Sequence, residues 1–176
     1  MSIIEIHHKI MGVTGHRSNK VHWNGRSAYN KQVYDRLVRL AEAALKFYEP
    51  EMVYTGMALG FDQACAQACK NLEINYTAVI PHSDQSKLWP EHSRLYYDYL
   101  VSNATNQLTL ATGPFHVHHM TDRNQYLVDH SQTFLALWDG SNGGTADCVR
   151  RATKKNIPIY NVWDKWIKNN YTGDTK

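Results

Sequence analysis

Three short segments of the sequence combine glycines with small and polar residues in a way that could bind an anion. They cover residues 12–17, 55–60 and 139–145, and the last of them contains three glycines. Glycine allows a tight turn with uncovered N–H groups, and such groups at a helix start bind negative charge with the help of the helix dipole. Glycine after a strand is also common for purely steric reasons, so the hypothesis requires that the three segments meet in space.

Basic side chains near these segments could neutralise the anion. Arg123 is the one that we expect to hold it, because a guanidinium can bind a phosphate with two hydrogen bonds. The alternative is a surface arginine that stabilises a helix start together with Asp122. Arg17 could reach the same anion or could be solvated in its polar loop, and His16 beside it is a candidate ligand contact.

Two carboxylates, Asp62 and Asp139, are the candidate catalytic residues. Cleavage of an N-glycosidic bond needs a carboxylate that stabilises an oxocarbenium-like transition state or attacks the anomeric carbon. Asp139 could bind ribose hydroxyls or activate water, but it also suits a simple turn. Asp62 could bind ribose, and it equally suits the first turn of a helix. Asp84 and Glu91 are further acids that could serve.

Histidines form a cluster at His116, His118 and His119. In an extended segment His116 and His118 would share a face, which is compatible with a metal ion. Because no cysteine or regularly spaced carboxylate is nearby, we expect no metal ion there. The sequence also lacks a G-x-G-x-x-G at the first helix and a Walker A lysine, so we expect no cofactor and no ordinary hydride or phosphoryl transfer.

Short apolar runs typical of strands alternate with stretches of helical periodicity along the chain. The predicted strands are residues 9–13, 52–55, 76–80, 108–111, 133–138 and 157–162. The predicted helices are residues 28–48, 62–72, 89–103, 123–130 and 146–155. Residues 18–26 and 113–122 are predicted as loops.

This alternation predicts an α/β fold, a Rossmann-like three-layer sandwich with a mainly parallel sheet in a single domain. Right-handed crossovers place the loops after all strands at one edge, and ligands bind there near the switch in strand order. We therefore expect the three glycine-bearing segments in one crevice. The expected domain covers residues 1–164, and the polar tail at 165–176 is expected to fray.

Composition agrees with one globular domain. The chain has 176 residues, of which 43% are hydrophobic and 20% charged, which favours a buried core over disorder. The net charge is +3 and the basic residues are scattered, so nucleic acid is not an expected partner. Three cysteines without a C-x-x-C pair read as small core residues in a reducing compartment.

We expect no targeting signal in this sequence. The first residues are too polar for a signal peptide, and no apolar run reaches the ~20 residues that span a bilayer. We therefore expect a cytoplasmic protein without membrane contact. A tyrosine-rich stretch at residues 95–100 could belong to the core or could form a dimer surface, and a homodimer is our expectation by fold-level analogy.

The chain resembles the SLOG superfamily, the Rossmann-like group that includes the LOG proteins, the Smf/DprA proteins and the YspA/YpsA branch. Four stretches carry the resemblance, and the fourth is most similar to the YspA-type ending. They are residues 12–17, residues 55–62 with Ala64, Arg123 with Asn124, and residues 139–152 running into 157–159. The resemblance implies a nucleotide-derived ligand whose phosphate lies near Gly143, Gly144 and Thr145.

The sequence departs from the LOG pattern at one informative point. LOG phosphoribohydrolases carry a P-G-G-x-G-T-x-x-E motif, whose glutamate serves hydrolysis. Alignment of Gly144 and Thr145 with that motif puts Cys148 at the glutamate position, and the proline is missing. Asp147 is adjacent but points about 100° away on a helix. The departure puts LOG-type catalysis in doubt.

The residue types and the resemblance to the SLOG superfamily together define an expected site. The candidate ligand contacts are Gly15, His16, Arg17, Thr55, Gly56, Met57, Gly60, Arg123, Asn124, Asp139, Gly140, Gly143, Gly144 and Thr145. Asp62 and Asp139 are the candidate catalytic groups.

Three functions are compatible with the sequence. The first is a sensor or sequestering protein for a nucleotide-derived ligand such as a nucleoside phosphate, an ADP-ribose-like or an NAD-like compound. The second is a nucleotide N-glycosidase, similar to nucleoside 5′-monophosphate phosphoribohydrolases. The third is nucleic-acid binding as in the Smf/DprA proteins, which the missing basic stripe argues against.

Overall fold

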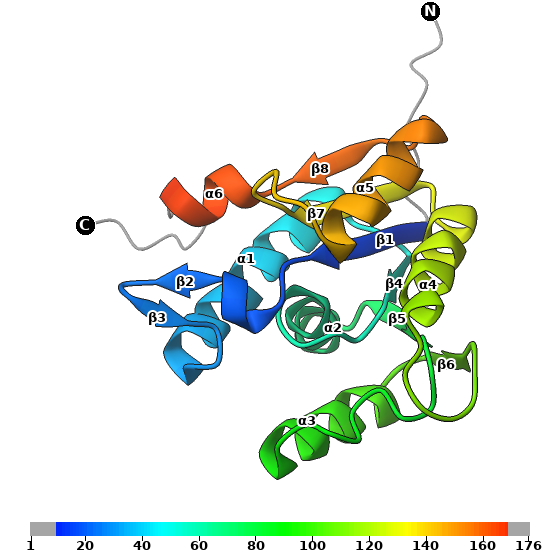
Figure 1. The fold of residues 1–176 in the computed structure, drawn as a ribbon. Helices are drawn as coiled ribbons and strands as arrows, with labels where there is room; N and C mark the ends of the chain where they lie inside the picture. Colours follow the sequence, from blue (N-terminus) through cyan, green and yellow to red (C-terminus); the bar gives the residue numbers. More distant parts are fainter. Residues whose placement is uncertain (1–9, 169–176) are drawn as a thin grey trace, which may run out of the picture.

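A six-stranded parallel sheet forms the centre of the computed structural model, which describes residues 10–168 (Figure 1). Its strands are β1 (Ile10–Gly15), β4 (Met52–Thr55), β5 (Asn75–Ile80), β6 (Asn106–Thr109), β7 (Thr133–Leu137) and β8 (Ile159–Asn161). Their order in the sheet is β6-β5-β4-β1-β7-β8. The chain thus moves outward from β1 in one direction as far as β6 and returns to the other side of β1 with β7. The predicted Rossmann-like α/β fold is confirmed.

Helices cover both faces of the sheet, as the two hydrophobic clusters show. One cluster joins the sheet to α1, α2, α3 and α6, and the other joins it to α4 and α5. The helices are α1 (Lys31–Tyr48), α2 (Phe61–Leu72), α3 (Glu91–Ser102), α4 (Val117–His130), α5 (Gly144–Lys154) and α6 (Trp163–Lys168). A layer of helices, the sheet and a second layer of helices make up the predicted three-layer sandwich.

Local sequence explains where α1 begins and ends. The Asn30 side chain accepts hydrogen bonds from the N–H groups of Gln32 and Val33 at 3.0 and 3.3 Å, which is the role of an N-cap. The apolar residues at helical spacing are buried: Val33, Leu37, Val38, Leu40, Ala41, Ala44 and Leu45. Glu49 closes the helix in a left-handed conformation just before Pro50.

Small residues let α2 lie deep in the molecule. Eight of its twelve residues are buried, so it packs closely beneath α1 and beside the sheet. Cys65 and Cys69 are among them, and Cys148 is buried on α5; all three are free thiols, as expected for core residues. Tyr97 of α3 is buried as well, whereas Tyr99 is partly exposed.

Helix α4 is the largest correction to the predicted elements. It begins at Val117, not at residue 123, so six of the ten residues of the expected histidine-rich loop are helical. The N–H group of His116 donates to Nδ1 of His119 at 3.2 Å, and this contact stabilises the helix start. Helix starts are usually recognised by Ser, Thr, Asp or Asn, so histidines in this role gave no such signal.

Other elements shift more modestly. The expected loop at 18–26 contains a 3₁₀ turn, η1 (Ser18–Lys20), and a short hairpin of β2 (His22–Trp23) and β3 (Arg26–Ser27). Strand β6 lies two residues earlier than predicted, at Asn106–Thr109. Strand β1 extends to Gly15, where it still pairs with Leu137.

The structured chain continues past residue 164, where the tail was expected to begin. Helix α6 reaches Lys168, and Trp166 is buried with its indole N–H donating to the His22 carbonyl at 3.2 Å. Residues 169–176 of the expected tail lie outside the described residues. Across residues 10–168, no helix has the length and apolarity that crossing a bilayer requires.

Candidate functional site

A cleft of about 510 Å³ lies at the carboxyl ends of β1 and β7, the neighbouring strands between which the strand order changes direction. Its walls include residues 14–17 at the end of β1, residues 141–145 between β7 and the start of α5, Ala58 after β4, and one side of α4. The three glycine-bearing segments therefore reach the same edge of the sheet. The predicted crevice exists, but the three segments contribute to it unequally.

The turn after β7 opens directly into the cleft. Gly143, with φ of 144°, precedes α5, and no side chain caps this helix start. The first backbone hydrogen bond of the helix runs from the Asp147 N–H to the Gly143 carbonyl at 3.0 Å. A Cβ atom added at Gly144 would meet no other atom within 4 Å. The N-terminal turn of α5 thus presents backbone N–H groups with open space above them, the arrangement that binds anions.

The turn after β4 is filled instead of open. A Cβ atom at Gly56 would lie 2.2 Å from Nη1 of Arg123, and one at Gly60 would lie 2.6 Å from the His16 carbonyl oxygen. Thr55, Gly56, Met57 and Gly60 do not line the cleft, and only Ala58 of this segment does. The N–H groups of Met57 and Ala58 donate within the protein, to the Thr55 hydroxyl at 3.4 Å and to the Asp62 carboxylate at 3.2 Å, so this turn does not offer them uncovered to the cleft as expected.

Arg123 lines the cleft from the second turn of α4 and is 8% exposed. Its Nη1 donates to the Gly56 carbonyl at 2.9 Å, and its Nε donates to Oδ1 of Asn124 at 3.2 Å. It is thus neither a surface arginine nor the first residue of a helix. Nη2 lies 3.9 Å from the sulfur of Met120, a weak acceptor, so this nitrogen keeps capacity for an anion.

Asp62 is a buried acid at the cleft, with 6% exposure. Its carboxylate accepts the Ala58 N–H at 3.2 Å, and the Thr55 hydroxyl donates to its backbone carbonyl at 2.9 Å. Burial raises the pKa of Asp62, and the charges of Arg123 and Arg17 oppose that rise. Asp62 combines access to the cleft with an unusual protonation equilibrium, which often marks functional groups.

Asp139 is committed to the turn and does not line the cleft. Its Oδ1 accepts from the Ser141 N–H at 2.9 Å and the Ser141 hydroxyl at 2.5 Å, and it lies 2.7 Å from Nε2 of His16. These hydrogen bonds hold the pKa of Asp139 well below its usual range. His16 lines the cleft, is 4% exposed, and packs edge-on against Trp163 at 5.6 Å between ring centroids. The pair joins the turns after β1 and β7.

Lys20 is a cleft residue that sequence reasoning missed. It belongs to η1, and its ammonium nitrogen lies 3.8 Å from the position of a Cβ atom at Gly143. Arg17 lines the same cleft, and among residues 10–168 neither side chain forms an ion pair. Lys20 lies in no motif, and only the fold of the 3₁₀ turn brings it to α5. No signal in the sequence could have found it.

Asn124 positions α5 relative to α4. Its Nδ2 donates to the Gly144 carbonyl at 3.1 Å and to Oδ2 of Asp147 at 3.0 Å. Asp147 lines the cleft but pairs with Arg151 at 2.8 Å. Cys148 is fully buried, and burial raises its pKa to about 12. The position of the LOG glutamate therefore lies in the core and supplies no carboxylate to the cleft.

The histidine cluster lies at the start of α4 and is larger than expected, because His82 joins it. His119 is 4.4 Å from His118, 5.3 Å from His116 and 5.4 Å from His82, between ring centroids. Burial and these neighbouring imidazoles lower the pKa of His119. In the described part of the chain, no group of three or more His, Cys, Asp or Glu side chains has an arrangement that could hold a metal ion.

A second pocket, of about 460 Å³, adjoins the cleft over β4 and β5. The two share Arg17, Ala58 and Met120 as lining residues. The second pocket is mainly apolar, and its rim carries Leu88 and Phe115, which are 95% and 57% exposed. The cleft that contains Arg17, Lys20 and Arg123 thus continues into a pocket with aromatic and aliphatic walls.

Solved structures with this fold bind different ligands. DprA from Helicobacter pylori, described by its single-stranded DNA binding mode, aligns with a TM-score of 0.61 and 13% identity, covering 93% of this chain and 74% of that chain. DprA from Streptococcus pneumoniae aligns with a TM-score of 0.58 and 18% identity, covering 86% of this chain but only 48% of that chain. The molybdenum cofactor binding protein of Rippkaea orientalis aligns with a TM-score of 0.54 and 16% identity, covering 93% of this chain and 84% of that chain. At these identities the likeness shows the fold alone.

One sequence expectation about partners is wrong. The scattered basic residues argued against nucleic acid, yet H. pylori DprA has this fold and binds single-stranded DNA. A few cations and backbone amides at one edge of a sheet can contact phosphates without a basic stripe along the sequence. Charge distribution along the chain therefore excludes no nucleic-acid partner.

Sequence relatives complete the comparison. The chain is 28% identical over 145 residues to the uncharacterized SPbeta prophage-derived protein YoqJ of Bacillus subtilis, covering 73% of this chain and 84% of that protein. The model of the YspA SLOG family matches residues 11–163.

Proposed function

The chain belongs to the YspA SLOG family, and we propose that it binds a nucleotide-derived ligand in the cleft between β1 and β7, as a sensor or sequestering protein. Candidate ligands are nucleoside phosphates and ADP-ribose-like or NAD-like compounds. The observation that carries the proposal is the uncapped start of α5, which faces the cationic groups Arg17, Lys20 and Arg123 across one cleft. Uncovered N–H groups and nearby cations together favour a phosphate.

The adjoining pocket supports a ligand that also carries a ring. Phosphate at α5 would leave the rest of the ligand to cross Arg17 and Met120 toward the apolar pocket with Phe115 and Trp89. A planar base buries apolar surface against such walls. We infer that AMP binds more tightly than ribose 5-phosphate, which shares the phosphate and the sugar but lacks the base.

Isothermal titration of AMP, ADP-ribose, NAD and ribose 5-phosphate tests both parts. Lys20→Ala is expected to weaken binding of all phosphate ligands about threefold to tenfold, which corresponds to the loss of one charge-assisted contact of roughly 1 kcal/mol. Lys46→Ala removes an equal charge from an exposed position on α1 and is expected to change nothing. Equal affinities for the two lysine variants, or no binding of any ligand by the wild type, would overturn the proposal.

The ring subsite has its own matched pair. Phe115→Ala is expected to weaken AMP binding but to leave ribose 5-phosphate unaffected. Phe47→Ala removes a ring that is 79% exposed on α1 and serves as the control. If Phe115→Ala affects both ligands equally or neither, the base does not occupy this pocket.

Hydrolysis is tested in the same samples by chromatography for free base. Asp62 is the only one of the two candidate catalytic acids that lines the cleft. Intact nucleotide is the result expected of a binding protein. Release of base that stops in Asp62→Asn would instead assign an N-glycosidase to this carboxylate.

A second candidate function is single-stranded DNA binding, and the continuity of the cleft with the apolar pocket favours it. Lys20 and Arg17 in the cleft and Lys87 in the pocket provide cations along a path that also contains the exposed Phe115 ring. Cations that follow a backbone and rings that stack on bases are the usual means of binding single strands. Fluorescence anisotropy of labelled oligothymidylate tests this: binding should fall steeply with salt and in Lys20→Ala/Lys87→Ala. Binding that is insensitive to both would exclude this path.

A further inference from the structure

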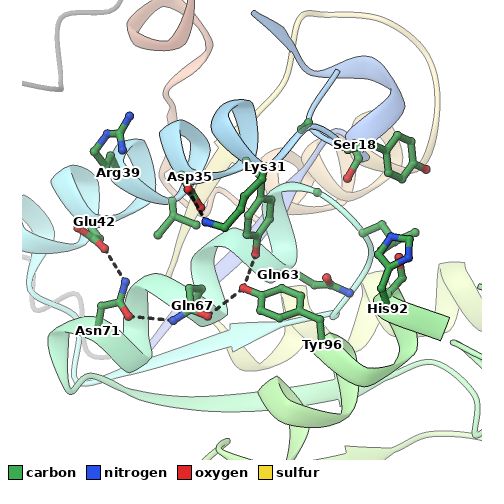
Figure 2. A pocket seen from close by; sticks show the side chains of 17 residues that line it. Ser18, Lys31, Asp35, Arg39, Glu42, Gln63, Gln67, Asn71, His92 and Tyr96 are labelled. Atoms are coloured by element: carbon green, nitrogen blue, oxygen red, sulfur yellow. Dashed lines mark hydrogen bonds and ion pairs between the residues drawn. The ribbon is translucent and has the colours of Figure 1, made fainter. Parts of the chain in front are cut away.

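Another cavity lies away from the cleft, between α1, α2 and α3. It has a volume of about 620 Å³, within the range of small-molecule sites. Figure 2 shows the carboxamides of Gln63, Gln67 and Asn71 on α2 between the α1 side chains and Tyr96 of α3. None of its lining residues also lines the cleft between β1 and β7. The cavity is therefore a separate candidate site.

A one-way chain of hydrogen bonds runs along this cavity. Tyr96 donates its hydroxyl to Oε1 of Gln67 at 2.9 Å, so the hydroxyl of Tyr34, 2.8 Å away, must be the donor to Tyr96. Gln67 Nε2 then donates to Oδ1 of Asn71 at 2.8 Å, and Asn71 Nδ2 donates to Oε1 of Glu42 at 2.7 Å (Figure 2). This series of hydrogen bonds ends on the Glu42 carboxylate, which can only accept, and this fixes which group is the donor in each bond.

These hydrogen bonds hold the side chains in fixed orientations, and the side chains keep further donors and acceptors for hydrogen bonds to a ligand. Gln67 and Asn71 each retain one N–H donor, the Tyr34 hydroxyl oxygen retains acceptor capacity, and Glu42 retains its second oxygen. Burial raises the pKa of Tyr96 to about 12, so the hydroxyl keeps its proton. Fixed planar donors and acceptors bind with a smaller loss of side-chain entropy than mobile ones.

Charges around the cavity cancel. Lys31 pairs with Asp35 at 2.7 Å, and Glu42 faces the same cavity as Arg39. The remaining walls are tyrosine rings, carboxamides, serines, His92 and a small aliphatic part made by Ala28, Val38, Leu59 and Gly60. A strongly charged ligand would gain no net attraction here, whereas an uncharged ligand rich in both donors and acceptors matches the lining. The tyrosine rings add apolar surface for the face of a ring.

We propose that the cavity between α1, α2 and α3 is a second binding site, for an uncharged ring compound with several hydroxyl groups. Hydroxyl groups both donate and accept, so they can donate to the free oxygen of Glu42 and accept from the free N–H groups of Gln67 and Asn71. A free sugar and the ribose of a nucleoside share this chemistry. The site is independent of phosphate binding at α5.

NMR titration of the full chain with D-glucose, D-ribose and adenosine as probes tests the proposal. The side-chain NH₂ signals of Gln67 and Asn71 report directly on the cavity, and saturable shifts of these signals by at least one probe are expected. Shifts with glucose or ribose would identify sugar recognition, and shifts with adenosine alone would identify a nucleoside. No saturable shift with any of the three probes would overturn the proposal.

Variants separate this cavity from the rest of the molecule. Gln67→Ala is expected to weaken probe binding about fivefold to tenfold, and Tyr96→Phe, which removes only the hydroxyl, should also weaken it. Gln125→Ala removes a carboxamide from α4 on the opposite face and should have no effect. Gly144→Asp, which places a carboxylate at the start of α5, should also leave probe binding intact. Probe binding unchanged in both cavity variants, or lost in Gly144→Asp, contradicts the assignment.

Discussion

The turn after β4 and the turn after β7 look alike in sequence but differ in what surrounds them. Both carry glycines, both follow strands of the same parallel sheet, and both precede a helix. Gly56 and Gly60 are glycines because Arg123 and the His16 carbonyl occupy the space that a side chain would need. Gly143 and Gly144 border an open cleft. The turn after β4 packs against Arg123 and His16, and so it supports the residues of the site. The turn after β7 presents its backbone to a ligand.

This difference shows that glycine at a strand end has two separate physical causes. Close packing of neighbouring atoms excludes a Cβ atom at Gly56, whereas at Gly144 no neighbouring atom would hinder one. Substitutions at the two positions should therefore affect different properties, stability in one case and ligand binding in the other.

The largest expected effect is on stability, from Gly56→Ala. The added methyl would overlap Nη1 of Arg123 and break its hydrogen bond to the Gly56 carbonyl, so we expect a loss of about 2–4 kcal/mol of unfolding free energy. Gly144→Ala is the matched control and should be neutral or stabilise by up to about 1 kcal/mol, since alanine favours helix over glycine. Urea unfolding measures the unfolding free energy of both variants. An equal loss in the two variants would show that the two turns do not differ in this way.

Ligand affinity, in contrast to stability, should be sensitive to a substitution at Gly144. Gly144→Asp adds an acid to the first turn of α5, which suits the helix dipole, so the melting temperature should not fall. The same carboxylate repels a bound phosphate, and AMP affinity should drop at least about tenfold. Calorimetry and thermal unfolding on the same sample measure the two effects. A variant that binds AMP like the wild type would rule out α5 as the anion site.

The pH dependence of stability separates the two acids of these turns. The folded-state pKa of Asp62 is raised, so its charged form destabilises the fold, and stability should rise as pH falls through that raised value toward the unfolded value of about 3.9. The folded-state pKa of Asp139 is lowered, so its contribution is present above the unfolded value and is lost as pH falls below it. Asp62→Asn should raise the melting temperature at neutral pH, and Asp139→Asn should lower it. Melting curves at neutral and acidic pH check both signs, and the same sign for both variants would contradict the account.

The smallest expected effect concerns the start of α4. His119 accepts the His116 N–H at the start of α4 only when Nδ1 is unprotonated, and its folded-state pKa is lowered. Stability from this contact should be complete above the unfolded pKa of about 6.5 and should fall as pH drops below it. His119→Asn keeps a side-chain acceptor and should remove this pH dependence. Hydrogen exchange of the His116 backbone N–H measures how often this contact opens. An opening equilibrium that does not change with pH in the wild type would refute the prediction.

Sequence patterns predicted the parts of the molecule that depend on local periodicity and strand order. The buried face of α1, the fully apolar β7 and the meeting of the three segments at one edge follow from helical spacing, burial and crossover handedness. Arg123 and Asp62 were also identified as cleft residues. These features depend on residues close together in the chain or on general rules of parallel sheets.

The remaining features depend on contacts between distant residues. Whether Gly56 is covered depends on Arg123, 67 residues away, and whether Asp139 is free depends on His16, 123 residues away. Lys20 reaches α5 only because a 3₁₀ turn forms in an irregular loop. The cavity with Gln67 and Tyr96 needs three helices at their actual positions. No local pattern contains this information.

The central claim is that the uncapped start of α5, and not the turn after β4, binds the phosphate. Titration of AMP into isotopically labelled protein tests it through the backbone N–H signals of Gly144 and Thr145 on one side and Gly56 on the other. The account predicts large, saturable downfield shifts of the Gly144 and Thr145 protons, with Gly56 nearly unchanged. Saturable AMP binding that leaves the Gly144 and Thr145 signals in place would contradict it.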